Sequence, residues 1–287
     1  MTYVMSGRLR LWTERFGDPA NPTVLLIMGA EAQGIGWPET LVQRLVAGGR
    51  QVIRYDHRDT GQSDGVDFDT EPYAMTDLAL DAIAVLDGHG IRAAHVVGAS
   101  MGGVVAQWLA VHAPERVLTL TTMITTPIDG APDRELPPPT PALLQRLAET
   151  ASAARDTDEQ RVAADILVFD ALNGGELPFD REAARDLAQR HVARARDWTR
   201  SANHHRAGQN RADVSPTPLS TITASTLVVA ATADPLFPLP HSEALAEQIP
   251  NARLVPIPGM GHGFLSPGLA DRVADLVLAH TGVAPPR

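Results

Sequence analysis

Apolar runs and stretches of helical spacing alternate along most of the chain. Buried strands are predicted where apolar, often β-branched residues follow one another without alternation, at 23–28, 51–55, 95–99, 117–123, 226–231 and 253–256. Helices are predicted between them, where apolar residues recur every three or four positions, at 38–47, 76–88, 104–110, 241–248 and 268–280. Strands that alternate with helices in this way predict an α/β fold, with a mostly parallel central sheet flanked by helices.

The first residues have a different pattern. Ser6-Gly7 is a turn signal between residues 2–5 and 8–16, and Leu9 and Leu11 alternate with polar residues. Alternation of this kind is typical of half-buried antiparallel strands. We therefore expect a hairpin ahead of the parallel strands.

The pattern changes again after residue 126. A proline-rich stretch, 136–141, precedes three helical patterns at 142–154, 158–172 and 181–200, and no strand pattern lies among them. Ser215-Pro216-Thr217-Pro218 closes the segment. We expect residues 1–126 and 215–287 to form a core domain, and residues 127–214 to form an inserted helical cap.

Composition narrows the classes of function. The 287 residues carry a formal net charge of −10, which argues against nucleic acid or an anionic membrane as a partner. The chain has 0 cysteines, which excludes disulfides and thiolate chemistry and suits the cytoplasm. We see no signal-peptide pattern, and the longest apolar run, 24–28, is too short to cross a membrane. We expect a soluble cytoplasmic protein; its oligomeric state stays open.

The sequence Gly98-Ala99-Ser100-Met101-Gly102 lies between a predicted strand and a predicted helix. Gly-x-Ser-x-Gly in this context is typical of a nucleophile elbow, a tight turn that projects the serine hydroxyl. Glycine is needed on both sides because larger residues would make the strand and the helix collide. Ser100 is therefore the candidate nucleophile.

A serine nucleophile needs a base, and the base needs a carboxylate to orient it. Asp234 follows the predicted strand 226–231, and His262 follows the strand 253–256. Ligand sites in open α/β sheets gather at the carboxyl ends of strands, and the chain order serine, acid, histidine is typical of elbow enzymes. We predict a triad of Ser100, Asp234 and His262; Asp129 is a weaker alternative acid.

An acyl-transfer site also needs two N–H donors aimed at the developing oxyanion. We expect them from the backbone of Met101, the residue after the nucleophile, and of Ala30, in the turn after strand 23–28. Met28 and Trp37 are candidates for an apolar substrate pocket, with core packing as the equal alternative.

Other polar motifs favour structural roles. We interpret residues 56–59, with the sequence Asp-His-Arg-Asp, as a turn that braces the active-site loops, because no third metal ligand at a sensible spacing accompanies it. The adjacent His204 and His205 are expected on the solvated surface of the cap, with contact to the substrate as the weaker alternative. We expect neither a metal nor a cofactor.

These motifs together resemble the α/β-hydrolase fold family. The matching parts are Met28-Gly29-Ala30 in place of the usual His-Gly-x, residues 58–63, the elbow, Asp234 and Gly261-His262. Within it, residues 25–29, 53–61 and 257–262 are similar to the aclacinomycin methylesterase family of anthracycline-tailoring enzymes. The resemblance implies an α/β-hydrolase fold, the same triad and oxyanion donors, and removal of a methyl group from a carboxylate ester on a polyketide ring. Ala30 stands where that family leads us to expect glycine, which narrows the pocket slightly.

The main functional hypothesis is a cofactor-free serine hydrolase that cleaves a small hydrophobic carboxylic ester, with a methyl ester of an aromatic polyketide as the specific expectation. The same triad also serves carbon–carbon bond hydrolysis, lactone opening and cofactor-free haloperoxidase or perhydrolase chemistry, which the sequence separates poorly. A non-catalytic ligand-binding receptor is a further alternative, which is disfavoured because all three triad residues are present.

Overall fold

The computed structural model describes residues 2–210 and 216–282. Within them, eight strands form one sheet in the order β1-β2-β4-β3-β5-β6-β7-β8. The strands are β1 (Thr2–Ser6), β2 (Leu9–Phe16), β3 (Thr23–Ile27), β4 (Gln51–Tyr55), β5 (Ala94–Ala99), β6 (Val117–Met123), β7 (Ser225–Ala231) and β8 (Arg253–Ile257). β1 pairs with β2, and β2 with β4, in antiparallel fashion, while all other pairs are parallel. The N-terminal hairpin and the mostly parallel sheet are confirmed.

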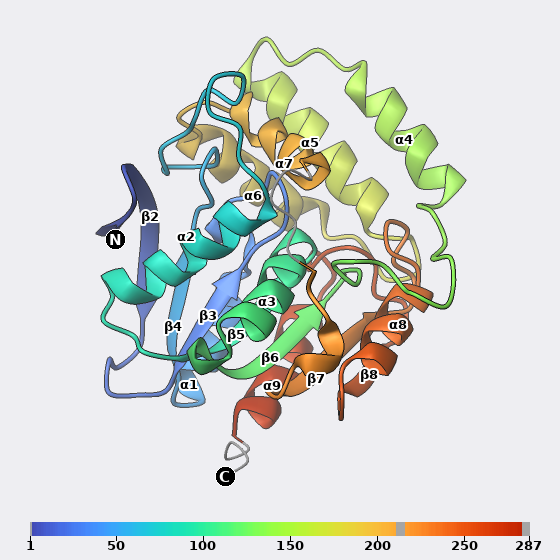
Figure 1. Ribbon diagram of the computed structural model, residues 1–287. Coiled ribbons are helices and arrows are strands. Elements are labelled where there is room, and N and C mark those ends of the chain that lie inside the picture. The colour runs from blue at the N-terminus through green and yellow to red at the C-terminus, as the bar shows by residue number, and fades with distance from the viewer. Residues whose placement is uncertain (1, 211–215, 283–287) are drawn as a thin grey trace.

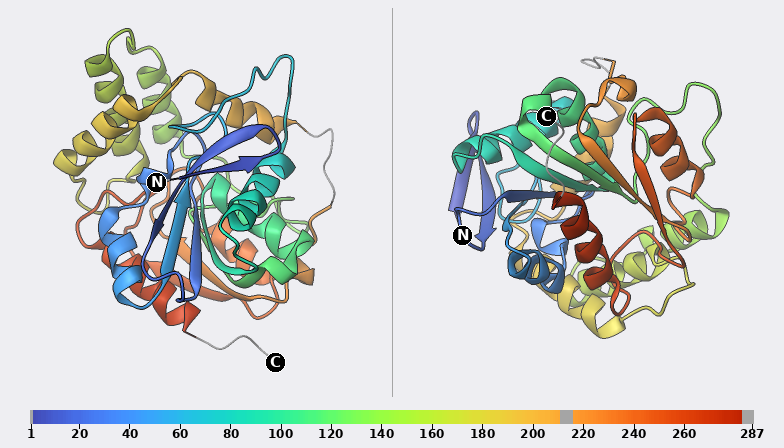
Figure 2. Two further views of the ribbon diagram at one scale, coloured as in Figure 1. Left: turned by 90° about the vertical axis from the view of Figure 1, so that its left-hand side faces the viewer. Right: turned by 90° about the horizontal axis from the view of Figure 1, so that it is seen from below.

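Helices cover both faces of the sheet (Figure 2). One face packs against α1 (Glu39–Ala47) and α9 (Leu269–Thr281), and the other against α2 (Met75–Gly88), α3 (Met101–His112) and α8 (Pro240–Gln248). Short 3-10 turns lie at Gly34–Gly36, Pro114–Arg116, Arg200–Ala202 and Leu219–Thr221. In residues 2–210 and 216–282, no helix is long and apolar enough to span a membrane.

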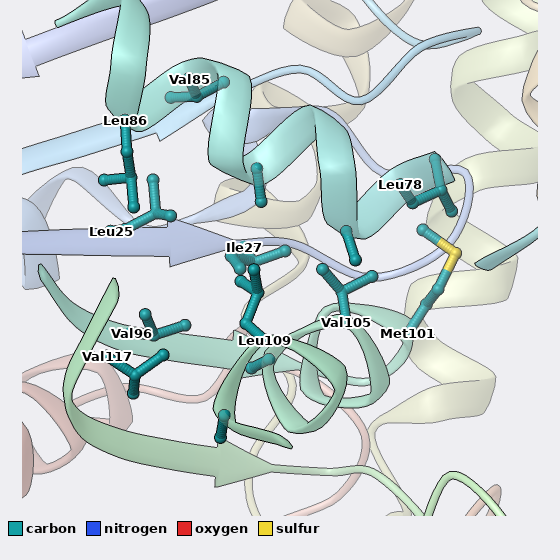
Figure 3. Packing of buried hydrophobic residues seen from close by; sticks show 14 of the residues in the cluster. Leu25, Ile27, Leu78, Val85, Leu86, Val96, Met101, Val105, Leu109 and Val117 are labelled. Atoms are coloured by element: carbon teal, nitrogen blue, oxygen red, sulfur yellow. The ribbon is translucent and has the colours of Figure 1, made fainter. Parts of the chain in front are cut away.

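The side chains of β3 show how one strand serves two cores. Leu25 and Ile27 pack into the cluster beneath α2 and α3, whereas Val24 and Leu26 pack against α1 and α9. This division follows from the two-residue period of a strand, and it explains why the predicted run lacks alternation. Figure 3 shows the first cluster, in which α2 and α3 cover β3 and β5 with Leu78, Val85, Leu86, Val105 and Leu109.

Between β6 and β7 the chain forms α4 (Pro141–Ala151), α5 (Asp158–Leu172), α6 (Arg181–Arg194) and α7 (Asn203–Gln209). These helices lie above the sheet in the view of Figure 1. The boundary that we placed between residues 214 and 215 lies outside the described residues.

The predicted helix 181–200 is wrong in its extent. The helix ends at Arg194 because Ala195 adopts an extended conformation and Arg196 donates its N–H to the carbonyl oxygen of Gly61, at 3.0 Å. A contact with the loop after β4 therefore outweighs local helical propensity. The short helix α7, which the sequence did not predict, follows this break.

Leu109 is fully buried between α3 and the sheet, whereas Leu80 on α2 is 48% exposed. We expect Leu109→Ala to lower the free energy of unfolding by about 2–5 kcal/mol, because it leaves a cavity in a packed core. Leu80→Ala removes the same atoms from the surface and should change it by less than about 0.5 kcal/mol. Urea denaturation of both variants checks this, and equal losses would contradict the packing.

Candidate active site

Ser100 lies in the tight turn between β5 and α3. Its backbone has φ 55° and ψ −124°, a conformation that residues with side chains rarely adopt. A Cβ on Gly98 would lie 2.2 Å from the carbonyl oxygen of Gly102, and a Cβ on Gly102 would lie 2.1 Å from that of Ile27. Both glycines are therefore required by close backbone approach, as the elbow pattern predicts.

The three predicted triad residues are brought together. His262 Nε2 lies 3.0 Å from Ser100 Oγ, and His262 Nδ1 lies 2.8 Å from Asp234 Oδ2. The other carboxylate oxygen of Asp234 accepts the N–H groups of Leu236 and Phe237, at 2.8 and 2.9 Å. The carboxylate thus presents an acceptor to Nδ1–H, which leaves the lone pair of Nε2 for the serine hydroxyl.

Asp129, the alternative acid, makes a different contact. Its Oδ2 accepts the N–H of Thr217 at 2.7 Å. It lines the cavity above Ser100, but the carboxylate that contacts His262 is that of Asp234.

The end of α5 contacts the loop that carries His262. The backbone N–H of His262 donates to the carbonyl oxygen of Leu172 at 2.7 Å, and Ser266 Oγ donates to Asn173 Oδ1 at 3.0 Å. A Cβ on Gly261 would lie 2.2 Å from the carbonyl oxygen of Asn173. The position of His262 therefore depends on residues that lie between β6 and β7.

The two predicted oxyanion donors lie on the loops that flank Ser100. Ala30 follows β3 and Met101 begins α3, and both residues line the same cavity as Ser100. A Cβ on Gly29 would lie 3.0 Å from Ser100 Cβ, so the loop after β3 runs directly against the serine. Their role as donors stays a prediction.

The loop after β3 also contacts α7 through two adjacent histidines. His204 Nδ1 accepts the backbone N–H of Glu31 at 3.0 Å, and His204 Nε2 donates to the carbonyl oxygen of Arg58 at 2.9 Å. His205 pairs with the Glu31 carboxylate. The expectation of a solvated His204 is wrong, because His204 is only 2% exposed. The side chain of His205 is 63% exposed, as expected.

A mostly apolar cavity of about 410 Å³ opens above Ser100, between the core and α7. Its lining includes Ala30, Met75, Met101, Val104, Trp108, Ile128, Asp129, His204, His205, Asn210, Leu236 and Phe237. The sequence contains a signal for two of these lining residues, because Val104 and Trp108 follow Ser100 by four and eight residues. That spacing places them on one face of α3.

The prediction that Met28 and Trp37 line the pocket is wrong. Both belong to the cluster on the α1 and α9 face of the sheet, where Trp37 is fully buried and its ring packs 5.2 Å from that of Phe264. Met28 shares this face with Val24 and Leu26, which are four and two residues before it. The strand period therefore directs Met28 away from the cavity.

The turn at residues 56–59 has the structural role that we predicted. Asp56 is fully buried and accepts the N–H groups of Gly34 and Gln62 and a guanidinium hydrogen of Arg194, at 2.7, 2.9 and 3.0 Å. It thereby ties the loop after β3 to α6. Among the described residues, no group of three or more His, Asp or Glu side chains is placed to hold a metal ion.

The family model described as "alpha/beta hydrolase fold" matches residues 22–268, which includes the elbow, Asp234 and His262. The chain belongs to this family. The α/β-hydrolase fold expected from the sequence is therefore confirmed.

Curated relatives of this alpha/beta hydrolase extend over nearly its whole length. It is 38% identical to rhodomycin D methylesterase DnrP of Streptomyces peucetius, with 98% of each chain covered. It is 37% identical to rhodomycin D methylesterase DauP of Streptomyces sp. strain C5, again over 98% of each chain. The resemblance to a family of methylesterases is thereby confirmed. Among solved structures, 2-hydroxy-6-oxo-6-phenylhexa-2,4-dienoate hydrolase from Rhodococcus sp. strain RHA1 is 22% identical, covers 98% of both chains and superposes with a TM-score of 0.75, which supports the fold alone.

Two glycines flank His262 and form a matched pair for mutagenesis. Gly261→Ala would drive a methyl group into the backbone of Asn173 and displace His262, whereas a Cβ on Gly263 meets nothing within 4 Å. We expect Gly261→Ala to lower kcat/KM by about 10²-fold, because misplacement of a catalytic group by about 1 Å has that effect. Gly263→Ala should stay within about threefold of the native enzyme. Ester hydrolysis assays check both, and equal effects would contradict the steric argument.

The Glu31–His205 pair should make stability depend on pH. Its hydrogen bond lowers the pKa of Glu31 below the ordinary 4.5, so the contribution of Glu31 is present above that pH and lost as the pH falls. The same bond raises the pKa of His205 above 6.5, so the contribution of His205 is present below that pH and lost as the pH rises through the raised pKa. The pair is therefore strongest between these two values.

We expect His205→Gln to lower the Tm at about pH 6 and to have less effect at about pH 9, because the native imidazole loses its proton as the pH rises through its raised pKa. Glu31→Gln should show the same dependence, and the double variant should add nothing further. Thermal denaturation at the two pH values measures this, and a loss in Tm that is independent of pH would contradict the ion pair.

Proposed function

We propose that this alpha/beta hydrolase is a serine esterase that cleaves a small hydrophobic carboxylic ester through an acyl-enzyme intermediate. The observation that carries the proposal is the continuous line of hydrogen bonds from Asp234 through His262 to Ser100, which ends beneath the apolar cavity. A nucleophile, a base and a group that orients the base are the parts that acyl transfer requires. The methylesterase relatives support the same class of reaction.

The proposed reaction follows from the contacts. Ser100 Oγ attacks the ester carbonyl while His262 Nε2 takes its proton, and the imidazolium is stabilised by Asp234. His262 then gives the proton to the departing alcohol, and the acyl group remains on Ser100. His262 then takes a proton from a water molecule, whose oxygen attacks the acyl carbon. As the bond to Ser100 Oγ breaks and the acid leaves, His262 returns this proton to Ser100. The backbone N–H groups of Ala30 and Met101 stabilise the oxyanion in both halves of the reaction.

The proposed substrate is a methyl ester of an aromatic polyketide. The relatives named as rhodomycin D methylesterases support this choice, and the apolar lining from Trp108, Ile128 and Phe237 suits a flat hydrophobic ring system. In this proposal residues 127–214 act as the helical cap that selects the substrate. The absence of cysteine in the sequence supports a cytoplasmic location.

A substrate panel tests the proposal. Purified protein is assayed with small aryl esters, simple methyl esters and anthracycline methyl esters. Turnover that includes the anthracycline methyl esters is the expected result. Turnover of aryl esters alone would overturn the proposed substrate and leave a generic esterase, while ring cleavage of a vinylogous diketone would replace ester hydrolysis by carbon–carbon bond hydrolysis.

Two variants test the assignment of the triad. Ser100→Ala should lower kcat by at least about 10⁴-fold, because the remaining groups have no nucleophile to activate. Asp234→Asn should lower it on the order of 10⁴-fold, because the amide favours the wrong tautomer of His262. Steady-state kinetics measure both, with circular dichroism as the control for folding. Full turnover by Ser100→Ala would overturn the mechanism.

A further inference from the structure

The loop from Met28 to Glu31 is fastened at both ends by buried imidazoles. His57 Nε2 donates to the carbonyl oxygen of Met28 at 2.9 Å, and His204 Nδ1 accepts the N–H of Glu31 at 3.0 Å. The peptide between Gly29 and Ala30 lies between these two anchors, and it carries the N–H that we propose as an oxyanion donor. The first anchor comes from the core, whereas the second comes from α7.

The contacts of His204 determine its tautomer. A carbonyl oxygen accepts only, so the ring nitrogen facing Arg58 carries the hydrogen, and the other nitrogen offers its lone pair to Glu31. His204 is 2% exposed, and burial lowers its pKa to about 3, so the ring stays neutral at physiological pH. A neutral imidazole with this tautomer is the form that accepts the Glu31 N–H.

Glu31, the residue whose N–H is anchored, has an unfavourable backbone conformation. Glu31 has φ 61°, in the left-handed region that residues with a Cβ rarely adopt. Without the bond from its N–H, the backbone at Glu31 is free to relax toward ordinary φ values, and the adjoining peptide turns with it. The hydrogen bond of His205 goes to the carboxylate of Glu31 and not to its backbone N–H, so it does not replace this anchor.

We infer that His204 is a positioning residue for the oxyanion hole: through the backbone of Glu31 it holds the Ala30 N–H toward the oxygen that becomes negative. This inference rests on the proposed esterase function. It gives α7 a part in the chemistry as well as in the shape of the cavity, because the geometry of a donor in the core is set by a side chain that lies between β6 and β7.

Two substitutions separate the two hydrogen bonds of His204. The Oδ1 atom of His204→Asn takes the place of Nδ1 and retains an acceptor for the Glu31 N–H. The Nε2 amide of His204→Gln takes the place of the ring Nε2 and retains the donor to Arg58. Each variant loses one bond and buries one amide, so both lose comparable stability, but only His204→Gln releases the loop. His191→Gln, at another buried histidine on α6, is the control for burying an amide in this segment.

The variants are assayed with 4-nitrophenyl butyrate and with phenylboronic acid, which forms a tetrahedral anion on a reactive serine and so reports on the oxyanion hole. We expect His204→Gln to lower kcat on the order of 10–10²-fold and to weaken boronate binding by a similar factor, with KM within about threefold. His204→Asn and His191→Gln should stay within about threefold of the native enzyme in both measurements.

Equal losses of kcat in His204→Asn and His204→Gln would overturn the positioning role, as would a loss in His204→Gln that leaves boronate affinity unchanged. Failure of the proposed function looks different. In that case the native protein does not turn over the ester, or Ser100→Ala turns it over equally well, and the positioning role falls with the esterase assignment.

Discussion

The site depends on the close approach of β5, α3 and the loop after β3 at Ser100. The carbonyl oxygens of Gly102 and Ile27 occupy the space that side chains at positions 98 and 102 would fill. This approach forces Ser100 into an unusual conformation, which the hydrogen bond from its N–H to Met123 helps to hold. The serine hydroxyl is thereby projected above the sheet, where the loops after β7 and β8 reach it.

Three loops at the carboxyl ends of the parallel strands have a second attachment, to the segment between β6 and β7. The His262 loop donates to Leu172, Glu31 donates to His204, and Asp56 accepts from Arg194. Catalytic loops are commonly less stable than the elements that carry them. Here the helices above the sheet hold these loops in place, so the same segment forms the wall of the cavity and supports the proposed catalytic groups.

The sequence predicted most of the fold and the residues that meet at Ser100, for physical reasons. Apolar runs and helical periods mark buried elements directly. The order of strands and helices then indicates which residues follow the carboxyl ends of strands, where ligand sites gather. The lining of the pocket was harder to predict from the sequence. The strand period directs Met28 into the opposite core, and the helix break after Arg194, which precedes α7, depends on the distant carbonyl oxygen of Gly61. The burial of His204 likewise follows from tertiary contacts with Glu31 and Arg58, and no local sequence pattern indicates these contacts.

β6 and β7 are adjacent in the sheet, with Met123 opposite Val229. The long segment that carries α4 to α7 therefore leaves and re-enters the sheet at neighbouring points, and the strand order does not depend on its length. In evolutionary terms such an insert is exchangeable, and a new insert brings a new cavity wall. A donor sequence grafted here for altered selectivity must nevertheless supply a carbonyl to the amide of His262 and a neutral acceptor to that of Glu31, which limits how freely the insert diverges.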